Sequence, residues 1–405
     1  MVSGTASIEV MKGVKSIKDI DLNGKRVLIR VDYNVPLDDD LNITDDTRMR
    51  ESLPTINYCI DHGAKSIVLV SHLGRPKGER NDKYSLRHIQ KRVERLLQRD
   101  VVFFSDIDDA KNGLSKLEGS QVALLENIRF YDGETKNDEE LSKKLGELCE
   151  VYVNDAFGTS HRKHASTYGV AMHAEERVAG LLIKKEIDSF AKALTHPQKP
   201  VTLVVGGAKV SGKLTLLKNI MHFVDKIVIG GAMSFTFLKA LGYNMQKSLV
   251  EDELLQEATQ VMEIAKDKGV KIYLPVDVVC TDDIKDPKVV KITTAQDIPL
   301  DFIGADIGPA TNRYFQEVIK DSQTIIWNGP MGVFEKDKFS RGTFYLAHAI
   351  AEAYAYTVVG GGDTADAVDR AGEKDNMSFI STGGGASLEL LEGKVLPAFE
   401  ALDRK

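Results

Sequence analysis

The sequence predicts an α/β protein with two doubly wound, mostly parallel sheets in separate domains. Short apolar runs alternate with helical patterns along the whole chain, as they do in βαβ units. The chain has 405 residues, which is more than one hydrophobic core usually accommodates. Between Thr195 and Pro200 two prolines stand three residues apart, and they must end the preceding helix. We therefore expect two domains joined near this segment.

The expected domains have the following bounds. Residues 1–185 form the first domain, residues 186–200 a hinge helix and linker, and residues 201–393 the second domain. The helical pattern Leu181–Ala193 places its apolar side chains on one side and then runs into the prolines. A helix that leaves one domain and enters the next is a natural hinge element.

Composition excludes several classes of protein. Hydrophobic residues make up 42% and charged residues 28% of the chain, which is typical of a globular protein. The net charge of −7 argues against a nucleic-acid-binding protein. The three cysteines form no metal or redox motif, and no apolar run has the length of a membrane span. No heptad run demands a partner, so we expect a cytoplasmic monomer that binds neither nucleic acid nor membrane.

Basic side chains follow several predicted strands of the first domain. The strands are expected at Arg26–Val31, Ser66–Val70, Val101–Phe104, Val122–Leu125 and Val151–Val153, and the clearest helix at Ser85–Gln98 with Ser85 as its N-cap. Ligands of open α/β sheets bind outside the carboxyl ends of the strands. The loops there carry His72, Arg75, Arg129, His161, Arg162 and His164, and Arg48 begins the helix after the first loop. Arginine forks match phosphate and carboxylate oxygens, so we expect a small ligand with more than one anionic group. The alternative is that these arginines are ordinary solvated loop charges.

The segment Gly206–Lys213 is the most informative stretch of the second domain. It lies between an expected strand, Val201–Val205, and an expected helix, Leu214–Val224. Glycines allow the backbone to approach an anion, the first helical turn offers free N–H groups, and Lys209 and Lys213 add positive charge. Leu214 stands where a P-loop requires a hydroxyl for Mg²⁺, so this is not a P-loop. The interpretation is a nucleotide phosphate site, and the alternative is a turn whose glycines serve packing alone.

Glycines end most of the other strands expected in the second domain. These strands are Lys226–Ile229, Lys271–Leu274, Thr324–Trp327, Tyr356–Val359 and Ser378–Ile380. Several glycine loops that converge on a polyphosphate would explain the pattern. Asp363 follows three glycines and suits a Mg²⁺ carried by a nucleotide, or it caps the next helix. Glu335 could bond ribose hydroxyls or be a plain surface carboxylate. No dinucleotide-binding fingerprint follows any strand.

Taken together, these motifs resemble the phosphoglycerate kinase family. The resemblance covers about residues 12–405 and rests on Arg30–Pro36, Ser71–Pro76, Asn154–Gly158, Gly206–Val210, Trp327–Glu335, Gly360–Ala365 and Ser381–Leu391. It implies two Rossmann-like domains and a reversible phosphoryl transfer between 1,3-bisphosphoglycerate and Mg-ADP that gives 3-phosphoglycerate and Mg-ATP. It also implies that the tail after about Lys394 packs with the first domain. Gly212 departs from the acidic residue expected there in many relatives, which loosens the lysine turn.

The resemblance also implies roles for individual residues. The glycerate substrate would be held by Asp32, Tyr33, Asn34, Arg48, His72, Leu73, Gly74, Arg75, Arg129 and Arg162. The nucleotide would be held by Gly207, Lys209, Lys213, Gly231, Gly304, Gly308, Asn328, Glu335, Gly361, Gly362, Asp363 and Thr364, with Mg²⁺ at Asp363 through the nucleotide. Arg48, Lys213 and the N–H groups around Gly384 would stabilise the transferring group.

Two other functions are compatible with two α/β halves. A nicotinamide-dependent dehydrogenase would need the dinucleotide fingerprint, which is missing. A nucleotide-binding scaffold with a decayed site would not need all the basic and acidic loop residues, which are present.

Overall fold

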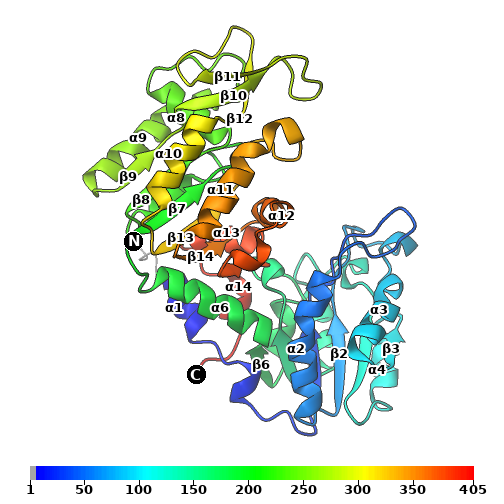
Figure 1. The fold of residues 1–405 in the computed structure, drawn as a ribbon. Helices are drawn as coiled ribbons and strands as arrows, with labels where there is room; N and C mark the ends of the chain where they lie inside the picture. The colour runs from blue at the N-terminus through cyan, green and yellow to red at the C-terminus, as the bar shows by residue number, and fades with distance from the viewer. Residues whose placement is uncertain (1–5) are drawn as a thin grey trace. The chain divides into compact units, whose positions relative to one another are not determined.

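The computed structural model describes residues 6–405, and they group into two compact units (Figure 1). The N-terminal unit comprises Ser7–Asp188 together with Val395–Lys405, and the C-terminal unit comprises Ser189–Lys394. Helix α6, Leu181–Leu194, contributes residues to both. Residues 6–405 include no helix with the length and apolar character that a membrane crossing requires.

The N-terminal unit is built on a six-stranded sheet in which every neighbouring pair is parallel. Its strand order is β3-β4-β2-β1-β5-β6. The direction of winding reverses between β1 and β5, which is where an open α/β sheet binds its ligand. The strands are β1 Arg26–Arg30, β2 Ser66–Val70, β3 Val101–Phe104, β4 Gln121–Leu125, β5 Val151–Asn154 and β6 Glu176–Ala179.

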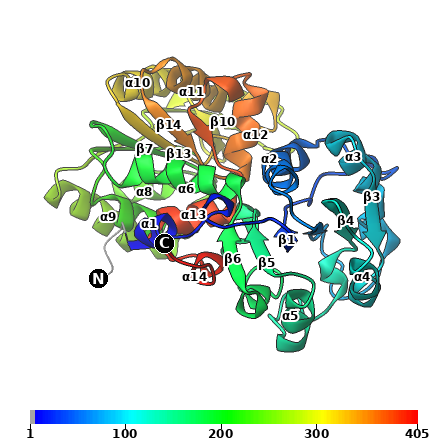
Figure 2. The ribbon, with the colours of Figure 1, turned by 90° about the horizontal axis from the view of Figure 1, so that it is seen from below.

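Helices cover both faces of this sheet. Figure 2 shows α2 and α3 on one face and α4 and α5 on the other. The core forms where apolar strand residues such as Val27, Ile29 and Ile67 meet the buried stripes of α2 and α3. The bounds are α1 Ala6–Lys12, α2 Thr47–Asp61, α3 Arg87–Leu97, α4 Ile107–Leu114 and α5 Glu139–Gly146.

The C-terminal unit repeats this architecture with the order β15-β14-β13-β7-β8-β9, again entirely parallel. Helices α10 and α11 lie on one face and α8 and α9 on the other (Figure 2). The strands are β7 Val201–Val205, β8 Lys226–Ile229, β9 Lys271–Tyr273, β13 Thr324–Asn328, β14 Tyr356–Val359 and β15 Phe379–Ile380. The helices are α7 Leu214–Ile220, α8 Met233–Ala240, α9 Leu255–Asp267, α10 Pro309–Ile319, α11 Arg341–Glu352, α12 Gly362–Arg370 and α13 Gly385–Leu391.

The predicted fold class is confirmed, and several details of the prediction are wrong. A three-stranded antiparallel sheet, β10 Asp277–Thr281, β11 Val290–Thr294 and β12 Ile303–Ile307, was not expected in the C-terminal unit. Helix α7 ends at Ile220, four residues before the predicted end at Val224. Ser85 is not the N-cap of α3, because Leu86 occupies that position. The Ser85 hydroxyl accepts from the Arg87 N–H at 3.2 Å and donates to Glu126 at 2.6 Å, so it still bonds the helix start.

The C-terminal segment belongs to the core of the N-terminal unit. Helix α14, Pro397–Glu400, carries the fully buried Phe399, whose ring centroid is 6.0 Å from that of Phe157. The Ala398 N–H donates to the Ser160 carbonyl at 3.1 Å. The Asp403 carboxylate accepts from the Arg177 side chain at 3.1 Å. The segment is therefore held by apolar burial and by hydrogen bonds to β6 and the loop after β5.

Replacing Phe399 with alanine is expected to destabilise the N-terminal unit by about 3–5 kcal/mol, because it removes a fully buried ring and leaves a cavity. Calorimetric unfolding should show a lower transition temperature. Tyr354→Ala is the control, since Tyr354 is 97% exposed and its removal should change stability by less than about 0.5 kcal/mol. Equal transition temperatures for Phe399→Ala and the wild type would contradict this account.

Candidate functional site

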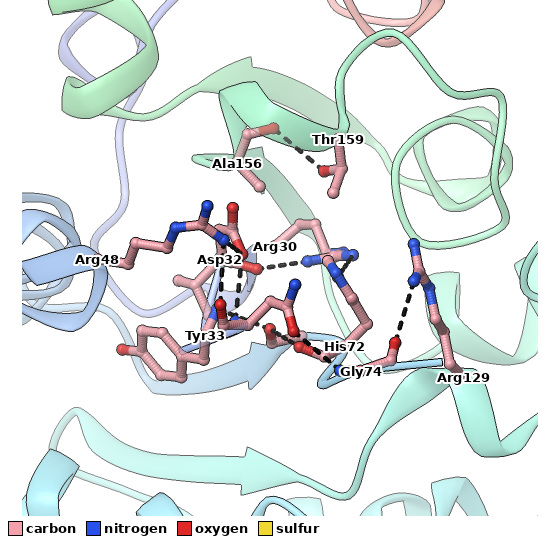
Figure 3. A network of polar contacts seen from close by, with 12 residues as sticks. Arg30, Asp32, Tyr33, Arg48, His72, Gly74, Arg129, Ala156 and Thr159 are labelled. Atoms are coloured by element: carbon pink, nitrogen blue, oxygen red, sulfur yellow. Dashed lines mark hydrogen bonds and ion pairs between the residues drawn. The ribbon is translucent and has the colours of Figure 1, made fainter. Parts of the chain in front are cut away.

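The first candidate site lies at the carboxyl ends of four neighbouring strands, β4, β2, β1 and β5. The loop after β1 is fixed by hydrogen bonds to the loop after β2. Asn34 Oδ1 accepts from the Gly74 N–H at 2.8 Å, and Ser71 Oγ accepts from the Tyr33 N–H at 2.8 Å. These bonds bring the two loops together, so that Asp32, His72 and Gly74 lie near one another (Figure 3).

Arg48 enters this site from the first turn of α2. Its Nη1 donates to Asp32 Oδ1 at 3.2 Å and to the Asn34 carbonyl at 3.1 Å (Figure 3). The Arg48 side chain is nevertheless 43% exposed. The guanidinium is therefore held by the loop after β1 and is still accessible to a ligand.

Arg129 approaches from the loop after β4. Its Nη1 donates to the Gly74 carbonyl at 3.1 Å, while its buried Nε has no hydrogen-bond partner among the described residues. Gly74 has a φ of +62°, and a Cβ there would lie 2.4 Å from the Tyr84 ring. Only glycine fits this turn without displacing Tyr84.

Two other predicted arginines are exposed: Arg75 in the loop after β2 and Arg162 in the loop after β5. Within residues 6–405 neither guanidinium has a hydrogen bond or an ion pair that would neutralise it. His164 is half-buried, and its Nδ1 has no hydrogen-bond partner in the same region. These groups are free to bind an anion.

The electrostatic consequence is an excess of positive charge. Burial, followed by the charges of Arg129 and Arg30, lowers the pKa of His164 to about 4. Burial, followed by the charge of Arg30, lowers the pKa of His72 well below its usual value. Both histidines are therefore neutral at pH 7. Asp32 pairs with Arg48, but the other arginines keep charges that an anionic ligand can satisfy.

Three predicted substrate residues have buried side chains, and one of them, His72, is 4% exposed. The Tyr33 ring is 1% exposed, and its hydroxyl lies 2.8 Å from Ser52 Oγ in the core beneath α2. Leu73 is 4% exposed, and its carbonyl accepts from Asn127 at 2.7 Å. The Tyr33 and Leu73 side chains belong to the core of the unit, which helps to hold the loops that carry them.

The second candidate site lies at the carboxyl ends of β7, β8, β13 and β14 in the C-terminal unit. Three of its loops touch backbone to backbone. A Cβ on Gly206 would lie 2.1 Å from the Pro330 carbonyl oxygen, one on Gly231 2.6 Å from Gly207, and one on Gly329 2.2 Å from the Gly206 carbonyl. Packing therefore accounts for these three glycines, which is the alternative that the sequence left open for the segment Gly206–Lys213.

Other glycines at this edge face open space. No heavy atom lies within 4 Å of a Cβ built on Gly207, Gly362 or Gly384. Gly207 has a φ of +109° and Gly384 a φ of +49°, which side-chain-bearing residues rarely adopt. Gly361 is the N-cap of α12, and Gly384 is the N-cap of α13. These positions leave backbone N–H groups accessible at the starts of two helices.

Lys213, Asn328 and Thr364 form the polar centre of this edge. Lys213 Nζ donates to Asn328 Oδ1, and Asn328 Nδ2 donates to the Gly360 carbonyl at 2.9 Å. The Thr364 hydroxyl accepts from the Gly329 N–H at 2.7 Å. Burial lowers the pKa of Lys213 to about 8, although the nearby carboxylates of Glu392 and Asp363 oppose the shift. An anion bound beside Lys213 would raise this pKa again, because it would stabilise the ammonium form.

The remaining predicted nucleotide residues divide into exposed and packed positions. Lys209, Glu335 and Asp363 are exposed. Asp363 lies in the first turn of α12 and is not its N-cap, which is Gly361. Gly304 and Gly308 pack closely against side chains. A Cβ on Gly304 would lie 2.3 Å from the Phe235 ring, and one on Gly308 would lie 2.3 Å from the Asp277 carboxylate.

The described side chains at this edge could not hold a metal ion without a bound nucleotide. The described residues contain no group of three or more His, Cys, Asp or Glu side chains that could hold a metal ion. Asp363 is an exposed carboxylate beside the free glycine backbone, and one such oxygen ligand suits a Mg²⁺ held mainly by phosphates. The residues present therefore fit a metal that arrives with a nucleotide.

The sequence predicts no role for three buried polar residues, although Arg30 stands in the motif Arg30–Pro36. Arg30, Glu134 and Ser166 are completely buried behind the first site, and Arg30 contacts His72 (Figure 3). Arg30 ends the apolar run of β1, and a charged residue there is the only signal in the sequence. Glu134 and Ser166 carry no local signal, because tertiary contacts alone bring them to Arg30.

Comparison with known proteins gives a consistent result. The family model described as phosphoglycerate kinase matches residues 17–394. A phosphoglycerate kinase of Wolinella succinogenes is 68% identical over 400 residues, which cover 99% of this chain and 100% of the relative. The phosphoglycerate kinase of Helicobacter hepaticus is 67% identical over 398 residues, which cover 98% of this chain and 99% of the relative.

Solved structures agree with these sequence relatives. The phosphoglycerate kinase of Coxiella burnetii superposes with a TM-score of 0.87 at 42% identity, covering 96% of this chain and 98% of the other. That of Pyrococcus horikoshii gives a TM-score of 0.82 at 31% identity, with the same coverage of 96% and 98%.

Proposed function

The chain belongs to the phosphoglycerate kinase family and transfers a phosphoryl group reversibly between 1,3-bisphosphoglycerate and ADP, and we propose that each of its units binds one of the two substrates. The cationic edge of the N-terminal unit binds the glycerate phosphate. The glycine-rich edge of the C-terminal unit binds the nucleotide with its Mg²⁺. The substrates meet when the units close about the helix α6.

The observation that carries the assignment of the glycerate substrate is the excess of positive charge around Arg129. A glycerate phosphate has a carboxylate and a phosphate, which together match several guanidinium groups. Arg129 has an unpartnered Nε, and the Arg75 and Arg162 guanidiniums have no ion pair within residues 6–405. A ligand with one negative charge would leave part of this cluster unsatisfied.

The nucleotide assignment rests on Lys213 and the free glycine backbone. Phosphate oxygens accept hydrogen bonds from N–H groups at helix starts, and an ammonium group attracts them further. Asp363 would hold the Mg²⁺ together with the nucleotide phosphates, and the metal would neutralise charge on them. The exposed Glu335 would accept hydrogen bonds from ribose hydroxyls.

The reaction requires positioning and charge neutralisation more than covalent help from the protein. The attacking oxygen is already ionised, so no general base is needed. We propose that Arg48 and Lys213 both contact the transferring group and that the N–H groups around Gly384 stabilise its equatorial oxygens. Closure excludes water, which would otherwise hydrolyse the acyl phosphate.

We further propose that the chain acts as a cytoplasmic monomer. The three cysteines, Cys59, Cys149 and Cys280, are free and buried, which suits a reducing compartment. Each proposed substrate site is assembled from loops of a single unit, so a second copy of the chain is not required to complete either one.

Arg48→Ala should reduce turnover by about 10³-fold or more, because a guanidinium that stabilises the transferring group is lost. A coupled assay with ATP and 3-phosphoglycerate measures turnover, and calorimetry should show unchanged nucleotide affinity. Arg48→Lys should recover only part of the rate, since the fork is lost. Arg50→Ala is the control on the same helix, because Arg50 is 61% exposed and bonds Asp46 at 2.9 Å. Near-normal turnover of Arg48→Ala would refute its role.

The kcat/KM for nucleotide should fall as pH rises through about 8, the pKa to which burial lowers Lys213. The sign follows because burial disfavours the ammonium form, so the amine becomes neutral above its pKa and no longer attracts phosphate. Lys213→Arg should abolish this fall, since a guanidinium stays charged, while reducing the rate at all pH values. The same fall in both proteins would mean that another group titrates.

Small-angle scattering should show a smaller radius of gyration only when 3-phosphoglycerate and Mg-nucleotide are both present. The reason is that contacts between the two bound ligands and both units stabilise the closed state. Each ligand alone is the matched control. Compaction without either ligand, or none with both, would contradict closure as the step that joins the substrates.

A further inference from the structure

A chain of buried polar groups connects Glu134 to His72 in the N-terminal unit. Glu134 is 0% exposed, and its carboxylate accepts from the Ser166 N–H at 2.7 Å and from the Ser166 hydroxyl at 2.6 Å. The Ser166 oxygen in turn accepts from Arg30 Nε at 2.8 Å. The buried guanidinium is thus balanced by a buried carboxylate through one hydroxyl, as burial of a charge requires.

The other end of the Arg30 guanidinium contacts a histidine ring. Arg30 Nη2 lies 2.9 Å from His72 Nδ1 (Figure 3). A guanidinium has only donors, so His72 Nδ1 must accept this hydrogen bond and carries no proton. The single proton of the neutral ring is therefore on Nε2. The imidazolium form is excluded, because it would place an N–H against the guanidinium.

We propose that Arg30 is a positioning residue that, through Glu134 and Ser166, fixes His72 as the neutral Nε2–H tautomer and so presents a hydrogen-bond donor to an oxyanion of the glycerate substrate. The proposal rests on the proposed function for the identity of that ligand. Arg30 does not itself touch the ligand, because its side chain is 0% exposed. Its remaining nitrogen, Nη1, donates to the Val31 carbonyl.

The surroundings of His72 explain why a neutral donor is useful there. Burial, followed by the charges of Arg30, Arg129 and Arg48, disfavours a positive charge on the ring. A neutral ring in an uncontrolled tautomer would present either a donor or a lone pair to the ligand. A lone pair would repel an oxyanion. Fixing the proton on Nε2 removes that possibility without adding charge.

Long-range ¹H–¹⁵N spectra of the full chain with ¹⁵N-labelled histidine test the tautomer directly. The His72 signals are identified by their loss in His72→Gln. At pH 7 without ligand, we expect His72 to show an unprotonated Nδ1 and a protonated Nε2. A protonated Nδ1, as the other tautomer or as imidazolium, would overturn the proposal.

Variants distinguish a role of Arg30 in positioning His72 from a role in the stability of the fold alone. Arg30→Met combined with Glu134→Gln removes both buried charges, and Ser166→Ala keeps both while removing the bridge. In either protein, His72 should become a mixture of tautomers. The KM for 3-phosphoglycerate should rise about tenfold or more, while kcat changes by less than about threefold, because ground-state binding is affected most. If the double variant does not fold, Ser166→Ala decides the question.

Arg26→Met combined with Glu150→Gln is the matched control. Arg26 is on the same strand, β1, and its Nε bonds the Glu150 carboxylate at 3.4 Å, away from His72. The control should leave both the His72 tautomer and the KM unchanged. A raised KM in the Arg30 or Ser166 variants with an unchanged tautomer would overturn the proposal, because Arg30 would then act by another route.

Calorimetric titration of the wild type with 3-phosphoglycerate tests the proposed function separately from the assignment of the His72 tautomer. If 3-phosphoglycerate binds and His72 is the Nε2–H tautomer, both the proposed function and the tautomer assignment are supported. Absence of binding while His72 holds that form would overturn the proposed function, and with it the ligand role of His72, but the tautomer assignment would stand.

Discussion

Like charges crowded at one edge of a parallel sheet are the constraint on which the N-terminal unit depends. In a parallel sheet the carboxyl ends of all strands meet at the same edge, so basic residues on different loops must approach one another. Burial, followed by the positive charges of the arginines, lowers the pKa values of His72 and His164. An anion bound at this edge, as proposed, would reduce the repulsion among these charges.

In the C-terminal unit, the main constraint is the close approach of several loops, which brings many backbone N–H groups to one edge of the sheet. Gly206, Gly231 and Gly329 allow three loops to pass within van der Waals contact, where any side chain would clash. The loops so assembled leave Gly207, Gly362 and Gly384 facing open space. The two sets of glycines thus have different roles: one set packs the loops together, and the other leaves backbone free for a ligand.

The start of helix α6 is tied to the edge of the first sheet through Asp155. This carboxylate is buried after β5 and accepts from the Leu182 N–H at 3.0 Å, while the Thr55 hydroxyl accepts from the Leu181 N–H at 2.9 Å. Burial raises the pKa of Asp155 to about 7, although hydrogen bonds from the Thr55 side chain and from the Ile183 and Leu182 N–H groups oppose the shift. The helix that contributes residues to both units therefore begins beside the loop that follows β5, the loop that carries Arg162.

The sequence predicted the strands of the two parallel sheets except β6, together with the parallel architecture and the chemistry of the loops, because apolar periodicity and residue type are local properties. It correctly placed Arg48 at a helix start and Lys213 beside a glycine turn, although their roles stay predictions. It missed the antiparallel strands β10–β12, because their pairing depends on contacts far apart in the chain.

Only the tertiary structure decided that Tyr33 faces the core, that some glycines serve packing and others leave space, and that Arg30, Ser166 and Glu134 form a buried chain behind His72. These features arise from residues up to 136 positions apart, as between Arg30 and Ser166, and no local pattern records which distant side chain will fill a given space.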